Sequence, residues 1–161
     1  MPTDSEGYNN MCVFVCCTTQ YPVVVPLKVN SAAALASAFI DFVLPVTGGA
    51  GCRSSTADSG SPQVSVLLED FCTALNIDRH FAFPEHQQAN YAETIVKRTK
   101  EVLRRCLVHV EIGDNWRQLL PQATAQMITT VGRSGVSPYE AVFGRPPVPV
   151  VEIALCAAHG T

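Results

Sequence analysis

A long amphipathic segment in the second half of the sequence most constrains how this chain folds. From about Asn90 to Val110, polar and apolar residues recur with the period of an α-helix. With Glu93 set at 0° and each residue advanced by about 100°, Lys97, Lys100 and Arg104 fall within about 40° of it. The segment therefore predicts one helix with a charged face. Its apolar face holds Val96, Thr99, Leu103, Cys106 and Val110.

The positive charge of this segment is unusual for the chain as a whole. The sequence carries a net charge of -3 and has 11 basic residues, and five of these follow Glu93 within the nine positions 97–105. An acidic chain can contact nucleic acid only through a local basic patch, which this helix would provide. At 161 residues, 47% hydrophobic and 16% charged, the chain is expected to be one globular domain with its own core.

Cysteine and histidine patterns give no signature of a zinc site. The seven cysteines include no CxxC pair, and the four histidines are scattered. We expect buried or free reduced thiols, with metal or disulfide roles as the minor alternatives. No secretory signal is visible, and the longest apolar segment, Ala32 to Val46, is too short to span a bilayer. We therefore expect a soluble intracellular protein with no membrane partner.

The rest of the sequence predicts strands first and helices later. Two β-rich runs, Met11–Cys17 and Tyr21–Leu27, predict an antiparallel hairpin, and a helix N-capped by Ser31 should end before Gly48. The glycine- and serine-rich segment 49–62 has the composition of a loop. Next we expect a helix within 64–77, a strand at 79–83 and a loop over 84–90. A helix over 115–130 should be bent or restarted at Pro121. A short helix should follow, with Ser137 as N-cap, Pro138 at its first position and Gly144 at its end.

This order predicts an α/β fold with a helical C-terminal half. We divide the chain into a flexible N-terminal segment at 1–10, a core domain at 11–146 and a C-terminal tail or linker at 147–161.

Two carboxylates could carry chemistry. Asp58 follows the segment RSSTA, and Glu93 lies at the start of the amphipathic helix. Oxygen ligands of this kind hold Mg²⁺ or Mn²⁺, and a basic stripe beside them would hold a phosphate backbone. The alternative is structural: Asp58 as a turn residue before Gly60, and Glu93 as a first-turn carboxylate favoured by the helix dipole.

Four segments resemble the integrase catalytic domain of LTR retrotransposons, especially the gypsy-type and retroviral group. CVFVCCTTQYPVVVPLK resembles the family's strand pair, ADSGSPQ its "SDxGxQF" and FPEHQQANYAE its "YHPQxNGxxE". The segment NWRQLLPQATAQMITTVGRSGVSPYEAVFGRPP resembles the family's tail, "W…LLP…SPYELVFGRPP". The similarity runs from about residue 7 to 148.

The resemblance implies a ribonuclease-H-like mixed sheet flanked by helices, in which residues 53–57 are a core strand rather than a loop. It implies that Asp58 and Glu93 are the second and third carboxylates of a DDE metal-binding triad, and that Lys97 and Lys100 contact DNA. Arg104 continues that stripe. The implied cofactor is Mg²⁺ or Mn²⁺, and the implied partners are DNA ends, target DNA and further copies of the chain. A functional copy would act in the nucleus.

The sequence also departs from the family pattern. The family's first Asp lies on a strand before the hairpin, and the nearby acid, Asp4, stands too close to the hairpin. Asp58 and Glu93 are one residue closer together than usual, and Ser54 to Thr56 replace the apolar residues of a central strand. We therefore expect a truncated or decayed copy without its first strand and with impaired catalysis. The alternative is a non-catalytic module that binds nucleic acid or dimerises.

Overall fold

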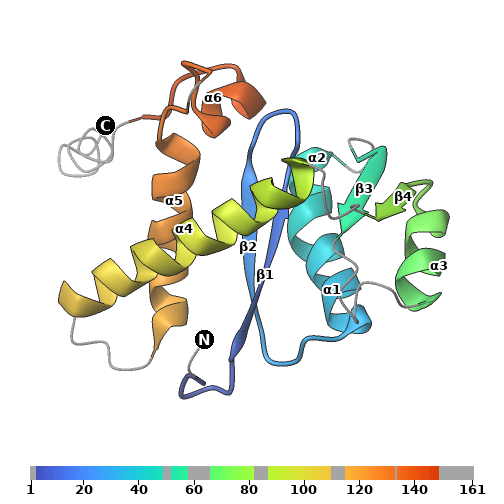
Figure 1. Ribbon diagram of the computed structural model, residues 1–161, viewed down its shortest axis with the longest axis horizontal. Coiled ribbons are helices and arrows are strands. Elements are labelled where there is room, and N and C mark those ends of the chain that lie inside the picture. Colours follow the sequence, from blue (N-terminus) through green and yellow to red (C-terminus); the bar gives the residue numbers. More distant parts are fainter. Residues whose placement is uncertain are drawn as a thin grey trace, which may run out of the picture.

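The computed structural model describes residues 3–48, 52–57, 66–81, 87–109, 115–132 and 134–148. Figure 1 shows a central hairpin crossed by one long helix, with a second pair of strands to its right. The strands are β1 (Asn10–Val15), β2 (Pro22–Leu27), β3 (Ser54–Ala57) and β4 (Asp78–Phe81). The helices are α1 (Ala32–Ala38), η1 (Phe39–Val43), α2 (Leu44–Thr47), α3 (Val66–Ala74), α4 (Gln87–His109), η3 (Trp116–Leu119), α5 (Leu120–Thr129) and α6 (Pro138–Phe143).

The predicted hairpin is confirmed. β1 and β2 pair antiparallel, with Asn10 opposite Leu27 and Val15 opposite Pro22. Their β-branched and aromatic side chains suit a pleated, half-buried surface. The turn closes through the Gln20 amide, which donates to the Cys16 carbonyl at 2.8 Å, and Gln20 itself has a φ of 62°.

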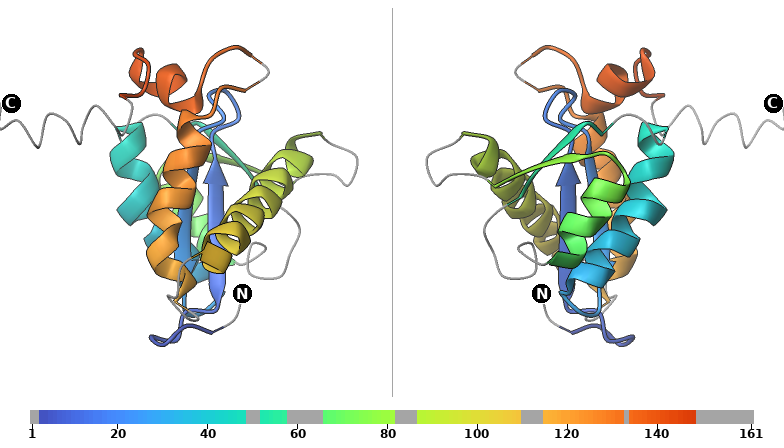
Figure 2. Two further views of the ribbon diagram at one scale, coloured as in Figure 1. Left: turned by 90° about the vertical axis from the view of Figure 1, so that its left-hand side faces the viewer. Right: turned by 90° about the vertical axis from the view of Figure 1, so that its right-hand side faces the viewer.

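Alternate residues of the hairpin face two different helical layers. Met11 and Val24 pack against a cluster from α4, η3 and α5 that contains Leu103 and Trp116. Phe14, Val23 and the neighbouring β2 residues pack instead against α1. Figure 2 shows the result: α4 crosses one side of the hairpin and α1 lies on the other. This two-residue alternation places α4 directly on the sheet.

The segment after the hairpin folds as the sequence predicts. The Ser31 hydroxyl accepts the Ala34 amide at 3.2 Å, which caps α1. The helix widens into the π-helical turn η1, continues as α2 and ends at Gly48, whose φ of 67° is left-handed. A glycine adopts that conformation without the Cβ penalty, so the helix ends there.

Residues 54–57 form a strand, so the composition-based loop prediction for this part of 49–62 is wrong. The strand that the resemblance implies is present as β3, and it pairs in parallel with β4, from Ser54 opposite Asp78 to Ala57 opposite Phe81. Ser54 and Thr56 are exposed. Strands inside a parallel sheet are buried and apolar on both faces, and β3 is neither, which is why its composition resembles a loop.

The C-terminal half also follows the prediction. Trp116 to Leu119 form a 3-10 turn, and the α-helix α5 then starts at Leu120 with Pro121 in its first turn. Ser137 caps α6 by accepting the Glu140 amide at 3.1 Å, and Gly144, with a φ of 67°, ends it. α5 lies along the hairpin and contacts both β2 and α4.

Candidate nucleic-acid interface

The long helix α4 carries most of the predicted functional residues. It begins at Gln87, three residues before the predicted start, so the expected loop over 84–90 is wrong from residue 87 onward. Ile95, Thr99 and Leu103 are buried, and the Thr99 hydroxyl donates to the Ile95 carbonyl at 2.8 Å. This buried face fixes the rotation of the helix, and the charged residues therefore point outward.

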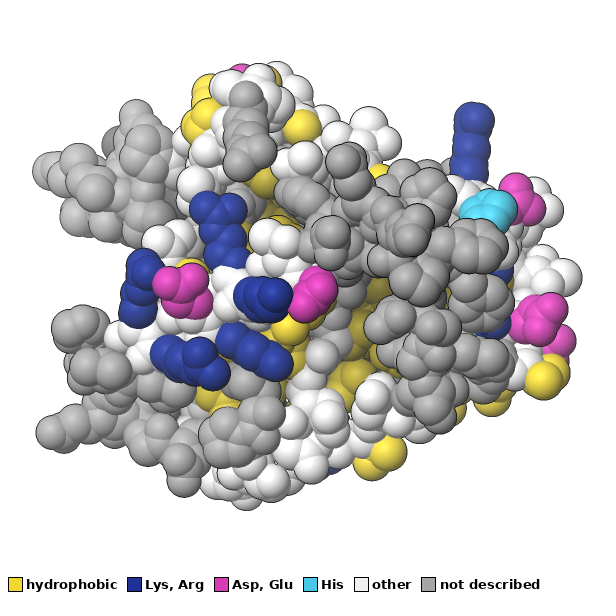
Figure 3. Space-filling model, in the orientation of Figure 1, with side chains coloured by type: hydrophobic (Ala, Val, Ile, Leu, Met, Phe, Trp, Pro, Cys, Tyr) yellow, Lys and Arg dark blue, Asp and Glu magenta, His cyan; other side chains and the backbone are white. Residues whose placement is uncertain are grey.

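The outward face of α4 is crowded with basic side chains. Figure 3 shows them gathered over this helix, with acidic side chains between them. Lys97 Nζ lies 3.1 Å from Glu93 Oε1, and Arg105 Nη2 lies 2.6 Å from Glu101 Oε1. Both pairs are well exposed, and such pairs contribute little to stability, about 0.3–0.5 kcal/mol each at i,i+4 spacing.

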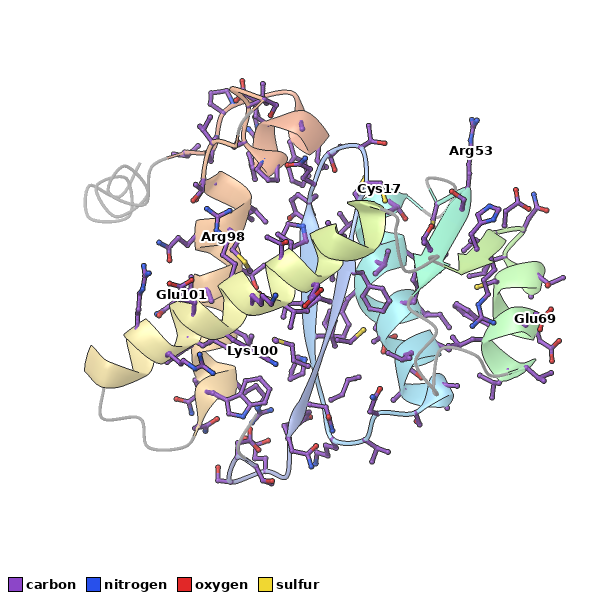
Figure 4. All side chains as sticks on the ribbon, in the orientation of Figure 1. Cys17, Arg53, Glu69, Arg98, Lys100 and Glu101 are labelled. Atoms are coloured by element: carbon purple, nitrogen blue, oxygen red, sulfur yellow. The ribbon has the colours of Figure 1, made fainter. Side chains whose placement is uncertain are left out.

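Three further cations on α4 are available for an external anion. Arg98, Lys100 and Arg104 form no ion pair within the described part of the chain. Figure 4 shows Arg98 and Lys100 projecting from opposite flanks of the helix. The predicted stripe thus lies on one helix, with Lys97 and Arg104 exposed and Lys100 half-buried. Arg98 is also exposed, although it lies outside the 40° sector around Glu93 that the sequence predicted. We call these four residues the α4 basic face.

Of the two predicted carboxylates, the structure describes only Glu93. Glu93 is exposed on α4. Asp58 lies outside the described residues, but its neighbour Ala57 is the last residue of β3, and β3 contacts α4. Asp58 therefore directly follows, in the sequence, a strand that packs against the helix carrying Glu93.

Asp4 is engaged elsewhere in the structure. Its Oδ1 accepts the amides of Glu6 at 2.9 Å and Tyr8 at 2.8 Å, and its Oδ2 lies 3.3 Å from Arg117 Nε. Tyr8 packs against the cluster that contains Leu103, which is ten residues further along α4 than Glu93. At about 1.5 Å of rise per residue, roughly 15 Å of helix separates Leu103 from Glu93. The fold therefore holds Asp4 away from Glu93.

The donor chemistry fits a hard divalent cation only in part. Two carboxylates are suitable oxygen ligands for Mg²⁺ or Mn²⁺. Among the described residues, however, no group of three or more His, Cys, Asp or Glu side chains could hold a metal ion. Likewise, no helix in the described part of the chain is long and apolar enough to cross a membrane.

Sequence comparison finds similar segments in retroviral polyproteins. The chain is 29% identical over 151 residues to the Gag-Pol polyprotein of avian reticuloendotheliosis virus, covering 92% of this chain and 13% of the viral protein. It is 28% identical over 148 residues to the Gag-Pol polyprotein of gibbon ape leukemia virus, covering 91% and 8%. The chain thus spans about a tenth of these relatives. No protein-family model matches it.

Structural comparison finds retroviral integrase cores. The HTLV-2 integrase catalytic core domain in complex with magnesium aligns with a TM-score of 0.69 at 17% identity, covering 82% of this chain and 83% of that one. The BIV integrase core aligns with a TM-score of 0.66 at 18% identity, covering 83% and 85%. The simian T-cell lymphotropic virus intasome, in complex with a PP2A regulatory subunit, aligns at 0.71 and 15%, covering 86% and 50%. The predicted ribonuclease-H-like α/β fold and the resemblance to retroviral and LTR-element integrase cores are confirmed.

Proposed function

We propose that this chain is the DNA-integration domain of a retroviral or LTR-retrotransposon polyprotein, and that the α4 basic face holds the DNA backbone. The observation that carries the proposal is the concentration of exposed cations beside Glu93 on a helix packed against β3. Lys and Arg side chains on one helix face bind phosphates without reading sequence. The similarity to Gag-Pol polyproteins supports the proposal.

The ancestral reaction would be 3′-end processing, in which water breaks a phosphodiester bond and leaves a 3′-hydroxyl, followed by strand transfer. In strand transfer that 3′-hydroxyl attacks a phosphodiester bond of the target DNA, so that one bond breaks as a new one forms. Glu93 and Asp58 would hold Mg²⁺ or Mn²⁺, and the α4 basic face would hold the DNA so that its scissile phosphate lies beside these carboxylates. When bound, the metal would stabilise negative charge on the attacking and leaving oxygens. The magnesium complex of the HTLV-2 core supports a divalent cation as cofactor.

We propose further that catalysis by the isolated chain is impaired. Within the described residues no group of three His, Cys, Asp or Glu side chains gathers to hold a metal, and Asp4, the acid nearest the hairpin, is paired with Arg117. The same observations favour the second candidate function, a module that binds DNA without cutting it. In either case the place of action is the nucleus, where the target DNA lies.

The test compares DNA binding and DNA joining in the same set of variants. Lys100→Glu combined with Arg104→Glu should weaken binding to a duplex roughly tenfold or more at low salt, and should lower the slope of log K against log salt by about 2. Arg53→Glu combined with Arg145→Glu is the matched control, because both arginines are exposed and lie outside α4. An equal loss in both double variants would contradict the proposed interface.

The joining assay separates the two candidate functions. Asp58→Asn with Glu93→Gln should not weaken DNA binding, because it removes negative charge next to the α4 basic face and releases Lys97 from Glu93. Strand transfer by the unmodified chain in Mg²⁺ or Mn²⁺, abolished by Glu93→Gln, would contradict impairment and establish the enzyme. Binding without any strand transfer supports the non-catalytic module.

We also propose that copies of the chain associate with one another. Ile40, Phe42 and Val46, in η1 and α2, are 48%, 50% and 40% exposed, and large apolar side chains gathered on one segment are typical of an interface. The dimeric and trimeric forms of the HTLV-2 core support self-association. Phe42→Arg should lower the mass measured by light scattering, whereas Val29→Arg, at a position 62% exposed, should not.

A further inference from the structure

Four cysteine thiols gather between the hairpin and the sheet of β3 and β4. Cys16 and Cys17 follow β1, Cys52 precedes β3, and Cys72 lies near the end of α3. Cys16 and Cys17 are exposed, Cys52 is half-buried, Cys72 is buried, and all four are free thiols. Figure 4 shows Cys17 at the turn end of the hairpin. The proposed binding of DNA uses none of these side chains.

The backbone of the hairpin fixes the position of Cys16. Its amide donates to the Tyr21 carbonyl at 3.0 Å, which continues the ladder one residue beyond the end of β1. Alternate residues of a strand face the same side, so Cys16 lies on the face of Phe14. The Phe14 ring lies 5.7 Å from that of Phe39, and Phe39 lies 5.7 Å from Phe71 of α3. Cys16 therefore lies on the side of the hairpin on which these rings connect β1 to α3.

Backbone hydrogen bonds hold Cys52 beside the end of α3. The Ile77 amide donates to the Cys72 carbonyl at 2.8 Å, at the turn that ends α3. The next amide, that of Asp78, donates to the Arg53 carbonyl at 2.9 Å, and Arg53 directly follows Cys52. The start of β4 thus connects the backbone of Cys72 to the residue next to Cys52.

The four thiols are close enough to influence one another's ionisation. Burial raises the pKa of the Cys52 thiol, and the nearby Cys72, Cys16 and Cys17 thiols raise it further. Among the described residues, however, no group of three or more such side chains could hold a metal ion. The grouping therefore suits a reaction between two thiols rather than a metal site.

We propose that Cys16 and Cys52 form a reversible disulfide bond when the chain meets oxidised glutathione. Cys16 is the first thiol to react because it is exposed. Partial burial raises the pKa of its thiol, but hydrogen bonds from Thr19 and Thr18 outweigh that effect and favour the reactive thiolate. Cys72 is buried, and access is a condition for this exchange.

The bond forms by two thiol–disulfide exchanges. The Cys16 thiolate attacks one sulfur of glutathione disulfide, so that a mixed disulfide forms and one glutathione leaves. Cys52 then gives up its proton and attacks the Cys16 sulfur, which releases the second glutathione. Two protein thiols are oxidised, one glutathione disulfide is reduced, and an excess of reduced glutathione reverses both steps.

The bond would join two sheets that share no hydrogen-bonded strand within the described residues. It closes a loop of residues 17–51 and ties the segment that enters β3 to the end of the hairpin. A cross-link of this kind removes freedom from the unfolded chain and limits separate opening of the second sheet. This inference does not depend on the proposed binding of DNA.

Peptide mapping without reduction identifies the bond. After the full chain is incubated with glutathione disulfide, trypsin should release peptide 1–28 joined to peptide 29–53, which contains Cys52 as its one cysteine. The thermal midpoint of the oxidised chain should rise by about 5 °C or more and return on reduction. Hydrogen exchange of residues 54–57 should slow in the oxidised chain.

Matched variants identify the partner within peptide 1–28, which also contains Cys12 and Cys17. Cys16→Ser should abolish both the cross-link and the thermal shift, whereas Cys17→Ser, at the adjacent exposed position, should retain them. A cross-link that survives Cys16→Ser would overturn the proposal. So would peptide 29–53 joined to peptide 54–79, which contains Cys72, or glutathione adducts without any cross-link.

Discussion

At the scale of single residues, the buried acid Asp4 shows how a non-local contact escapes sequence analysis. Nothing in PTDSEGY predicts a partner more than a hundred positions away, yet Asp4 pairs with Arg117, whose guanidinium also stacks 4.4 Å from the Tyr8 ring centroid. Burial opposes ionisation of Asp4, but the amides of Tyr8 and Glu6 and the charge of Arg117 outweigh it and lower its pKa. The N-terminal segment is therefore attached to η3.

Asp4→Asn should destabilise the fold in a pH-dependent way. Because the folded pKa of Asp4 lies below its ordinary value of 3.8, its contribution is fully present above that value and is lost as the pH falls through the folded pKa. The urea midpoints of parent and variant should therefore differ most near neutral pH and converge in strong acid. Glu6→Gln, which removes an exposed partner of Arg117, should have a smaller effect. A difference that grows in acid would contradict this assignment.

The cysteines should differ sharply in reactivity. Burial raises the pKa of Cys12 to about 12. Cys16 is exposed. Partial burial raises the pKa of its thiol, but hydrogen bonds from the hydroxyl and amide of Thr19 and from the amide of Thr18 outweigh that effect and lower the pKa. Thiolate is the reactive form, so iodoacetamide at pH 8 should label Cys16 well before Cys12. Peptide mass spectrometry over a time course measures both rates, and labelling of Cys12 at the rate of Cys16 would count against the burial of the Cys12 thiol.

At the scale of secondary-structure elements, local signals were sufficient where the element depends on its own sequence. The Ser31 and Ser137 caps, the restart at Pro121 and the ends at Gly48 and Gly144 are all local, and the structure confirms them. β3 is different, because a strand of serine and threonine exists only through its pairing with β4. Only the resemblance, which carries the order of the whole fold, predicted it.

The basic side chains of α4 should contribute unequally to the affinity for DNA. Lys97 is 3.1 Å from Glu93, so part of its charge is already neutralised, whereas Lys100 has no ion-pair partner in the described structure. Lys100→Ala should therefore weaken DNA binding more than Lys97→Ala. Glu93→Gln releases Lys97 and should strengthen binding by a few-fold at low salt. Fluorescence anisotropy at several salt concentrations measures all three variants, and a larger loss for Lys97→Ala would contradict the ranking.

At the scale of the whole molecule, only half of the candidate site could be predicted from residue patterns. Glu93, Lys97, Lys100 and Arg104 share a helix, so their common face follows from the helical period alone. The relation of this face to Asp58 depends on how α4 packs against β3, which joins distant parts of the chain. Arg98 was missed because the packing of Thr99 and Leu103, rather than the position of Glu93, determines which sector of α4 is exposed.

The two sheets should also unfold with unequal ease, since among the described residues they share no hydrogen-bonded strand. Phe39 links Phe14 of the first sheet to Phe71, on the helix that contacts β4. Because Phe39 is only partly buried, Phe39→Ala should cost about 2–3 kcal/mol, below the usual range for a core phenylalanine. Hydrogen exchange should accelerate in β3, β4 and α3 more than in β1 and β2.

Phe143→Ala is the matched control for that prediction. Phe143 also makes two ring contacts, with Tyr21 and Tyr139, but it is 48% exposed and lies on α6, away from the second sheet. Its removal should cost less and leave exchange in β3 and β4 unchanged. Uniform acceleration in both variants would mean that the molecule opens as one cooperative unit. Selective acceleration in Phe39→Ala would show that the ring contacts of Phe39 with Phe14 and Phe71 couple β3, the strand that precedes Asp58, to the rest of the fold.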